Sequence, residues 1–391
     1  MYSMKKYIFP ATAIACMLSA STVFTACMNN DEETIIIESP HSGIPDDSQA
    51  SKNPTVINPT TTVPNIQTTL DEINGIPVIR VDMTGIKNAE DVDWLRLLGT
   101  GQEGQNVWVE VDGKPKGILV YNNADDIDEK AIKTDVVFTV DNSGSMDDEA
   151  DAIARDIVSW AQLLTNSHLD VNFGVVGYGG YVSGAINITS VTALSDYLNE
   201  GRGTSRTEHF GGADKSQLVQ YASSFPKTGR DVSTNECGAM AIRFADKYFS
   251  FRPGSNRIYV NFTDEPNQPD HNSDYSVQFF NNQNNWPAAK GTVHTVYSAN
   301  TFNSNSWNVN EQPWLISEYT GGTTLFTNSR FSGVTLESLP VTGAMENSYI
   351  IRFTNIEELL DGKNHTVHIT VVSNDNTIKA DKTFTVMFPQ K

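Results

Sequence analysis

The sequence predicts an α/β fold in which a doubly wound, mostly parallel sheet is inserted into an antiparallel β-sandwich formed by the flanking segments. Three observations lead to this prediction. Apolar strands alternate with helical patterns between residues 132 and 343, apolar and polar side chains alternate on both flanks, and two aspartates follow buried strands. Strand–helix alternation is typical of parallel sheets, and period-two alternation is typical of half-buried antiparallel strands.

The middle of the chain supplies the elements of the parallel sheet. Buried strands are predicted at Val136–Val140, Val171–Val176, Arg257–Phe262 and Thr292–Tyr297. Apolar residues recur at helical spacing over Glu149–Leu164, Leu218–Ser224 and Gly238–Tyr248. Ligands of such sheets bind beyond the carboxyl ends of the strands, where Asp141 and Asp264 fall.

Both flanks are predicted to be antiparallel. The first flank offers strands at Ile76–Met83 and Asn106–Val111, and Asp112-Gly113 supplies a hairpin turn after the second of them. The second flank offers strands at Tyr349–Phe353, His365–Val371 and Thr383–Val386. We therefore expect a β-sandwich whose first part is residues 66–131 and whose second part is residues 344–391.

The amino terminus predicts export. Lys5 and Lys6 precede a mostly apolar stretch, which indicates a secretory signal over residues 1–26. The ending at Cys27 resembles a bacterial lipoprotein box, which implies lipidation of that cysteine; an ordinary signal cut elsewhere is the alternative. The acidic run Met28–Glu33 is similar to the export tag of lipoproteins from the Bacteroides group. These features imply an outer membrane lipoprotein that faces the periplasm or the cell surface.

Composition predicts a tether after the signal and limits the partners. Residues 27–65 are acidic and then rich in Ser, Thr, Asn and Pro, so we expect a disordered tether. Removing the signal removes Lys5 and Lys6 and no acid, so the formal charge changes from −20 to −22. Such a charge disfavours nucleic acid and anionic membrane surfaces. The three cysteines, Cys16, Cys27 and Cys237, offer no intramolecular disulfide framework.

A metal site is predicted where the first buried strand of the middle region ends. Asp141, Ser143 and Ser145 form an Asp-x-Ser-x-Ser pattern of oxygen donors, which suits a small hard cation such as Mg²⁺. The same pattern is also common in turns and helix caps. Residues 132–343 resemble a von Willebrand factor type A domain, whose metal-ion-dependent adhesion site has this pattern. The distal aspartate of that family matches Asp264, and the family's last helix and Thr-Gly-Gly turn match Leu315–Thr323.

The resemblance implies further ligands. Most members of the family place a threonine in a later loop, which matches Thr234, but the segment is also similar to the integrin β-subunit version, in which a glutamate coordinates; that matches Glu236. We favour Glu236. In integrin β subunits the acids at this place hold a second cation, which Asp148 and Glu149 could also do; we favour the interpretation that acids in a first helical turn stabilise the helix dipole. The resemblance implies Mg²⁺, with Mn²⁺ and Ca²⁺ as alternatives.

The predicted function is metal-dependent adhesion or protein binding, in which the cation bridges to a carboxylate of a partner protein. The alternative is a structural role as a pilus-tip or envelope-assembly subunit that associates through β-strands. We do not expect an enzyme. No nucleophile elbow, His-Glu-x-x-His helix or phosphate-binding Gly-Lys-Ser/Thr loop occurs in the sequence, and neither Ser143 nor Ser145 has a neighbouring base in the sequence.

Overall fold

The computed structural model describes residues 43–87, 93–122, 132–146, 149–166, 169–199, 210, 217–225, 235–298, 310–327, 331 and 340–388. All of these residues belong to one compact unit, His41–Lys391. The predicted signal peptide, the lipidation site Cys27, the first part of the predicted tether, Asp148 and Thr234 lie outside the described residues.

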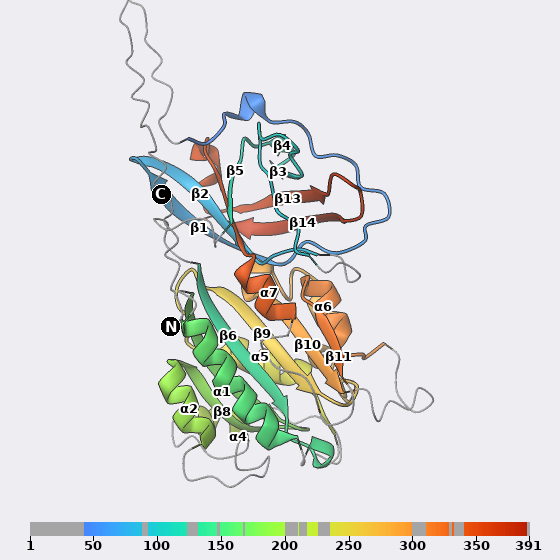
Figure 1. The fold of residues 1–391 in the computed structure, drawn as a ribbon. Helices are drawn as coiled ribbons and strands as arrows, with labels where there is room; N and C mark the ends of the chain where they lie inside the picture. Colours follow the sequence, from blue (N-terminus) through green and yellow to red (C-terminus); the bar gives the residue numbers. More distant parts are fainter. Residues whose placement is uncertain are drawn as a thin grey trace, which may run out of the picture. The chain divides into compact units, whose positions relative to one another are not determined.

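A six-stranded sheet occupies the middle of the chain (Figure 1). Its strand order is β11-β10-β9-β6-β7-β8, and every neighbouring pair is parallel except β7 and β8. The strands are β6 (Lys133–Asp141), β7 (Asp170–Tyr178), β8 (Val182–Thr189), β9 (Asn256–Thr263), β10 (Thr292–Ser298) and β11 (Thr324–Thr327). This arrangement confirms the predicted mostly parallel sheet.

Helices cover both faces of this sheet. They are α1 (Ala150–Asn166), α2 (Val191–Asn199), α4 (Gln217–Ser224), α5 (Gly238–Tyr248), α6 (Trp314–Thr320) and α7 (Pro340–Glu346). Alternate residues of a strand enter different cores. Phe138 packs on one face against Trp160 of α1, with ring centroids 5.5 Å apart, whereas Val137 belongs to the core under α5. The buried strands therefore read as continuous apolar runs because both faces are covered.

Two four-stranded antiparallel sheets draw strands from both flanks. One has the order β1-β2-β12-β5 and the other β14-β13-β3-β4. Their bounds are β1 (Ile66–Ile73), β2 (Ile76–Met83), β3 (Val107–Val111), β4 (Lys114–Pro115), β5 (Leu119–Asn122), β12 (Tyr349–Phe353), β13 (Asn364–Val372) and β14 (Lys379–Met387). Buried residues of both sheets share one hydrophobic core, separate from the cores of the six-stranded sheet. The exact domain boundaries stay a prediction.

Short 3-10 helices fill several of the connections. They are η1 (Asp47–Gln49), η2 (Gly144–Met146), η3 (Ser273–Tyr275), η4 (Val277–Asn281), η5 (Ala288–Lys290) and η8 (Glu357–Leu359).

Among the described residues, none of the helices combines the length and the apolar character needed to cross a membrane.

The structure differs from the sequence prediction over residues 43–65, which we expected to be a flexible tether. The backbone N–H of Asn53 donates to the carboxylate of Glu110 at 3.0 Å, and its side-chain amide donates to the hydroxyl of Thr370 in β13 at 3.0 Å. Val63 is fully buried in the core of the antiparallel sheets. Composition alone did not predict this packing, because polar side chains of residues 43–65 form hydrogen bonds with strands that are distant in the sequence.

The outer edge of β14 is partly covered by other segments of the chain. The side-chain amide of Gln283 donates to the carbonyl of Thr383 at 2.5 Å and accepts the N–H of Thr385 at 3.0 Å. At the other end, the backbone N–H of Thr60 donates to the carbonyl of Lys379 at 2.8 Å. These contacts occupy backbone groups that an edge strand otherwise offers to a partner strand.

Candidate metal centre

Three buried carboxylates meet at the carboxyl edge of the six-stranded sheet. Asp141 is the last residue of β6, Asp264 follows the last residue of the adjacent strand β9, and Glu236 lies just before α5. One carboxylate oxygen from each residue lies within 4.8 Å of the others. Asp141 is 0% exposed, and Glu236 and Asp264 are each 5% exposed. The parallel sheet thus brings together residues that are far apart in the sequence.

The loop after β6 places two hydroxyls beside these carboxylates. The backbone N–H of Ser143 donates to Oδ1 of Asp141 at 2.9 Å, which closes a local turn. The hydroxyls of Ser143 and Ser145 are hydrogen-bonded 3.0 Å apart, and the hydroxyl of Ser145 donates to Asp264 at 3.0 Å. Met146 is fully buried and anchors the loop in the core beneath. All three residues of the Asp-x-Ser-x-Ser pattern therefore join one oxygen-rich cluster.

A second layer of polar residues, which the sequence did not predict, holds Asp141. The hydroxyl of Thr263 donates to Oδ2 of Asp141 at 3.0 Å. Behind it, Asn261 accepts hydrogen bonds at 2.9 Å from Thr139 and from Tyr178. In the sequence these residues are recognisable only as polar positions inside otherwise apolar strands. The strand register shows which of them meet in the structure.

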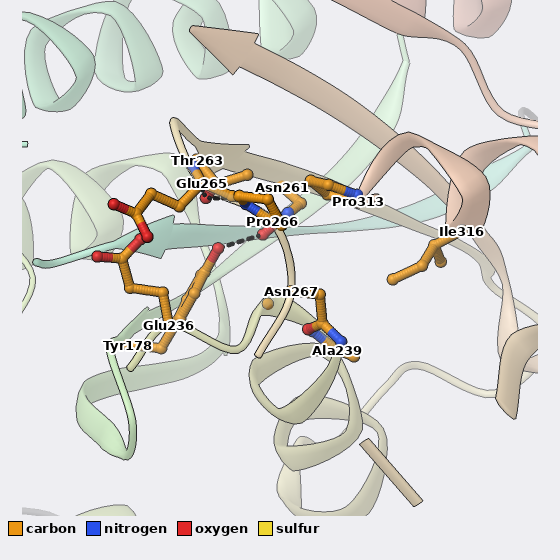
Figure 2. A pocket seen from close by; sticks show the side chains of 11 residues that line it. Tyr178, Glu236, Ala239, Asn261, Thr263, Glu265, Pro266, Asn267, Pro313 and Ile316 are labelled. Atoms are coloured by element: carbon orange, nitrogen blue, oxygen red, sulfur yellow. Dashed lines mark hydrogen bonds between the residues drawn. The ribbon is translucent and has the colours of Figure 1, made fainter. Parts of the chain in front are cut away.

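The position of Glu236 is fixed by the loop that follows β9. Its carbonyl accepts the N–H of Gln268 at 2.7 Å, and the side chain of Asn267 accepts the N–H of Ala239 at 3.1 Å, in the first turn of α5. Gly238 allows the start of α5 to pack closely against β9, because a Cβ at position 238 would lie 2.8 Å from the side chain of Asn261. Figure 2 shows the Glu236 carboxylate turned toward that of Glu265. Among the described residues, Oε2 of Glu236 is buried without a hydrogen-bond partner.

The electrostatics of the cluster favour a cation. Burial raises the pKa of Asp141, and burial together with the charge of Asp141 strongly raises the pKa of Glu236. Burial, reinforced by Asp141, raises the pKa of Asp264 to about 6. Among the described residues, neither Asp141 nor Glu236 forms a salt bridge with Lys or Arg. A divalent cation would offset both the burial cost and the mutual repulsion of these carboxylates.

The donor set fits a hard divalent ion. Asp141, Glu236 and Asp264 offer carboxylate oxygens, and Ser143 and Ser145 offer hydroxyl oxygens, which are the donors that Mg²⁺ and Ca²⁺ prefer. Ser143 is partly exposed and Ser145 is exposed, so the cluster reaches the surface on the side of the loop. An ion held here would be accessible to an outside ligand from that side.

The remaining predicted ligands have different outcomes. Thr234, the alternative to Glu236, lies outside the described residues. Asp148, proposed for a second cation, also lies outside them. Glu149 directly precedes α1 and is 4% exposed, but it is not part of the carboxylate group at Asp141. The second cation therefore stays a prediction, as do the individual ligand roles.

No family model matches the chain, and no curated protein matches it. Solved structures resemble it only distantly. One of them is a proximal thread matrix protein from the mussel byssus, which has a zinc-occupied MIDAS motif. It is 9% identical in sequence, the TM-score is 0.33, and the match covers 60% of this chain. A variant of the PilB minor pilin from Streptococcus sanguinis shares 12% identity with a TM-score of 0.29, over 68% of this chain and 75% of the pilin.

The pilus adhesin SpaC from Lactobacillus rhamnosus GG, in an open conformation, shares 12% identity with a TM-score of 0.33 over 86% of this chain. The chain spans 49% of the length of the mussel protein and 55% of that of SpaC. Similarity at this level carries no argument about function, which therefore depends on the geometry of the site.

Proposed function

We propose that the α/β part of this protein is a von Willebrand factor type A domain whose cluster at Asp141 binds Mg²⁺ and uses it to bind a partner protein. The observation that carries the proposal is the convergence of Asp141, Glu236 and Asp264 within 4.8 Å at the carboxyl edge of the sheet. These three carboxylates come from three separate segments, which argues against a local helix cap. A cap needs only one side chain and the first turn of one helix.

The adhesion role follows from the chemistry of such an ion. The residues named above are Asp141, Ser143, Ser145, Glu236 and Asp264, with Thr234 as the alternative to Glu236. Mg²⁺ keeps some positions for ligands from outside the protein, and a carboxylate is the most suitable donor that a partner protein offers. The buried carboxylates hold the ion, and Ser143 and Ser145 lie toward the accessible side. Mn²⁺ and Ca²⁺ are alternatives for the same donors.

We propose a binding role and no catalysis. The hydroxyl of Ser145 donates to Asp264, and the hydroxyl of Ser143 bonds to that of Ser145, an arrangement that suits ligands of an ion. We also propose attachment to the cell envelope through a lipid on Cys27, with the binding domain at the cell surface or in the periplasm. Incorporation of radiolabelled palmitate into the wild-type chain, and its loss in Cys27→Ala, tests the anchor.

Isothermal titration calorimetry of the chain with Mg²⁺, Mn²⁺ and Ca²⁺ tests the metal site. Wild type is expected to bind one ion at the cluster, and Asp141→Ala is expected to lose that binding with an unchanged circular dichroism spectrum. Wild type that binds none of the three ions would reduce the Asp-x-Ser-x-Ser pattern to a turn motif and would favour the structural alternative.

The alternative is a pilus-tip or envelope-assembly subunit that associates through β-strands. Its requirement is an open edge strand, and one outer edge, that of β14, is partly occupied by Gln283 and Thr60. This observation counts against pairing through β14. Association with another envelope protein that persists in EDTA and is abolished by a proline in β1 would support the alternative.

A further inference from the structure

Three aromatic rings form a cluster beside the carboxylate group, and we call Tyr297, Trp314 and Phe326 the aromatic shelf. The ring of Trp314 lies 5.0 Å from that of Tyr297 and 5.1 Å from that of Phe326, and the rings of Tyr297 and Phe326 are 6.2 Å apart. All three pairs have edge-to-face geometry. The rings come from β10, from the first residue of α6 and from β11.

The register of the sheet places the shelf in line with the metal centre. Tyr297 is the register partner of Thr263, which holds Asp141, and Phe326 is the register partner of Tyr297. Register partners in parallel strands carry their side chains on the same face. Since neighbouring strands are about 4.8 Å apart, Phe326 lies about 10 Å from β9, the strand that Asp264 follows.

A small recess extends from Glu236 to the start of α6. Its lining includes Glu236 and Glu265 at one end and Pro313, the residue before Trp314, at the other (Figure 2). The pKa of Tyr297 is raised by burial and by the charges of Asp264, Glu265 and Glu236, which is consistent with this proximity. A ligand held at the ion would therefore be close enough to contact the shelf.

The shelf is open at its outer end. Tyr297 is 2% exposed, Trp314 is partly exposed and Phe326 is 57% exposed. Rings that serve only as core are buried throughout, whereas exposure here increases with distance from the metal centre. Exposed Phe and Trp are enriched where proteins bind other proteins, because such rings supply large contact areas at low entropic cost.

We propose that the aromatic shelf is the second half of the ligand-binding surface and that the occupant is an extended segment of a partner protein. The segment carries one Asp or Glu, which binds the ion, and one aromatic or large aliphatic residue about three positions away, which packs on Trp314 and Phe326. An extended chain advances about 3.3 Å per residue, so three residues span about 10 Å. This inference depends on the proposed function, because the ion supplies the first contact.

Charge favours this occupant. The chain has a formal charge of −20, so a partner segment with many acids is repelled. The bound ion is the attractive point for one carboxylate, and the rest of the segment gains most from apolar contact. A neutral glycan also stacks on aromatic rings, but it brings no anionic donor for the ion.

The test uses short fluorescent peptides in a Gly/Ser background that contain one Asp and one Trp separated by zero to four residues. Anisotropy in Mg²⁺ is expected to show the tightest binding when Trp stands two to four positions from Asp, about tenfold tighter than for the matched peptide with Ala in place of Trp. Phe326→Ser is expected to remove most of this preference and to retain binding of the Asp–Ala peptide. Met387→Ser, at an exposed methionine of β14, is the matched control and is expected to retain the preference.

The outcomes separate the two proposals. If Asp peptides bind in Mg²⁺ with no preference for Trp, or if Phe326→Ser keeps the preference, the shelf proposal is wrong and the metal site stands. If no peptide binds in a Mg²⁺-dependent way, the proposed function and the shelf proposal both fail. Equal binding of the Trp peptide and of a neutral oligosaccharide probe would also overturn the choice of a peptide.

Discussion

Thr263, the last residue of β9, donates a hydrogen bond of 3.0 Å to Oδ2 of Asp141, the last residue of β6. Oδ1 of the same carboxylate accepts the N–H of Ser143. Asp141 is thus oriented from two sides by groups that belong to two different segments. Such supporting hydrogen bonds keep a ligand in position before the ion arrives.

Thr263→Val is expected to weaken Mg²⁺ binding by at least about tenfold, because loss of a group that orients a metal ligand typically costs 10–100-fold in affinity. Thr263→Ser keeps the hydroxyl and is the matched control. Calorimetric titration measures both variants. Equal affinity of the valine and serine variants would show that the hydrogen bond does not orient Asp141 for the ion.

Metal removal is expected to reduce stability. A ligand present at 100 times its dissociation constant stabilises the native state by about 2.7 kcal/mol. Urea unfolding of the wild type should therefore show a higher midpoint in Mg²⁺ than in EDTA. Asp141→Ala should show the same midpoint in both buffers. A wild-type midpoint that does not respond to EDTA would contradict the metal site.

Glu236→Gln is expected to abolish ion binding while keeping or increasing the stability of the metal-free protein by about 1 kcal/mol. The reason is that burial beside Asp141 strongly raises the pKa of Glu236, so the metal-free protein must protonate this carboxyl on folding near neutral pH; a neutral amide avoids that cost. Unfolding in EDTA measures the stability. Glu72→Gln, at an exposed glutamate of β1, is the control for the loss of one charge. A clear loss of stability in Glu236→Gln alone would mean that Glu236 holds the fold and not the ion.

His294 in β10 is expected to make the protein sensitive to acid. Burial lowers its pKa from 6.5 to about 3, and its Nδ1 accepts the N–H of Thr323 at 3.1 Å. The unfolded chain binds a proton near pH 6.5, but the folded chain does not until about pH 3. The stabilising contribution is therefore complete above pH 6.5 and is lost as the pH falls toward 3, with a slope of about 1.4 kcal/mol per pH unit.

Urea unfolding between pH 7 and pH 4 measures this effect. His294→Asn is expected to be less stable at pH 7 and to lose that slope, whereas the variant of the exposed His271, His271→Asn, should keep it. If wild type and His294→Asn showed the same pH dependence, His294 would not be the group that responds to acid.

Gln283→Ala is expected to uncover part of the β14 edge. It removes the hydrogen bonds to Thr383 and Thr385, each of which contributes about 1 kcal/mol. Analytical ultracentrifugation should then detect more self-association than in wild type, since free edge strands pair with one another. Gln278→Ala, which removes a hydrogen bond to Tyr319 on α6, is the matched control. No change in association would mean that the edge is closed by other means.

The sequence was most informative where buried strands run continuously. The predicted strand Tyr349–Phe353 and helix Gly238–Tyr248 have the observed bounds of β12 and α5. The antiparallel strand β8 was missed because the turn after β7 returns the chain within a few residues and leaves a short, irregular register. Pattern alone also missed β1, β11 and the packing of residues 43–65, which depend on partners far away in the chain.

The site was partly predictable for the same reason. Asp141 and Asp264 were identified because each follows a strand, and the structure places both in one cluster with Glu236. The supporting roles of Thr263 and Asn261 required the strand register, which periodicity does not fix. The aromatic shelf required knowledge of which strand lies at the edge of the sheet.

One divalent cation is expected to bind among Asp141, Glu236 and Asp264. Anomalous diffraction at the manganese edge, from crystals grown with Mn²⁺, tests it most directly. We expect one strong anomalous peak in contact with these carboxylates. A map with no peak at saturating Mn²⁺, or with its strongest peak away from Asp141, would contradict it.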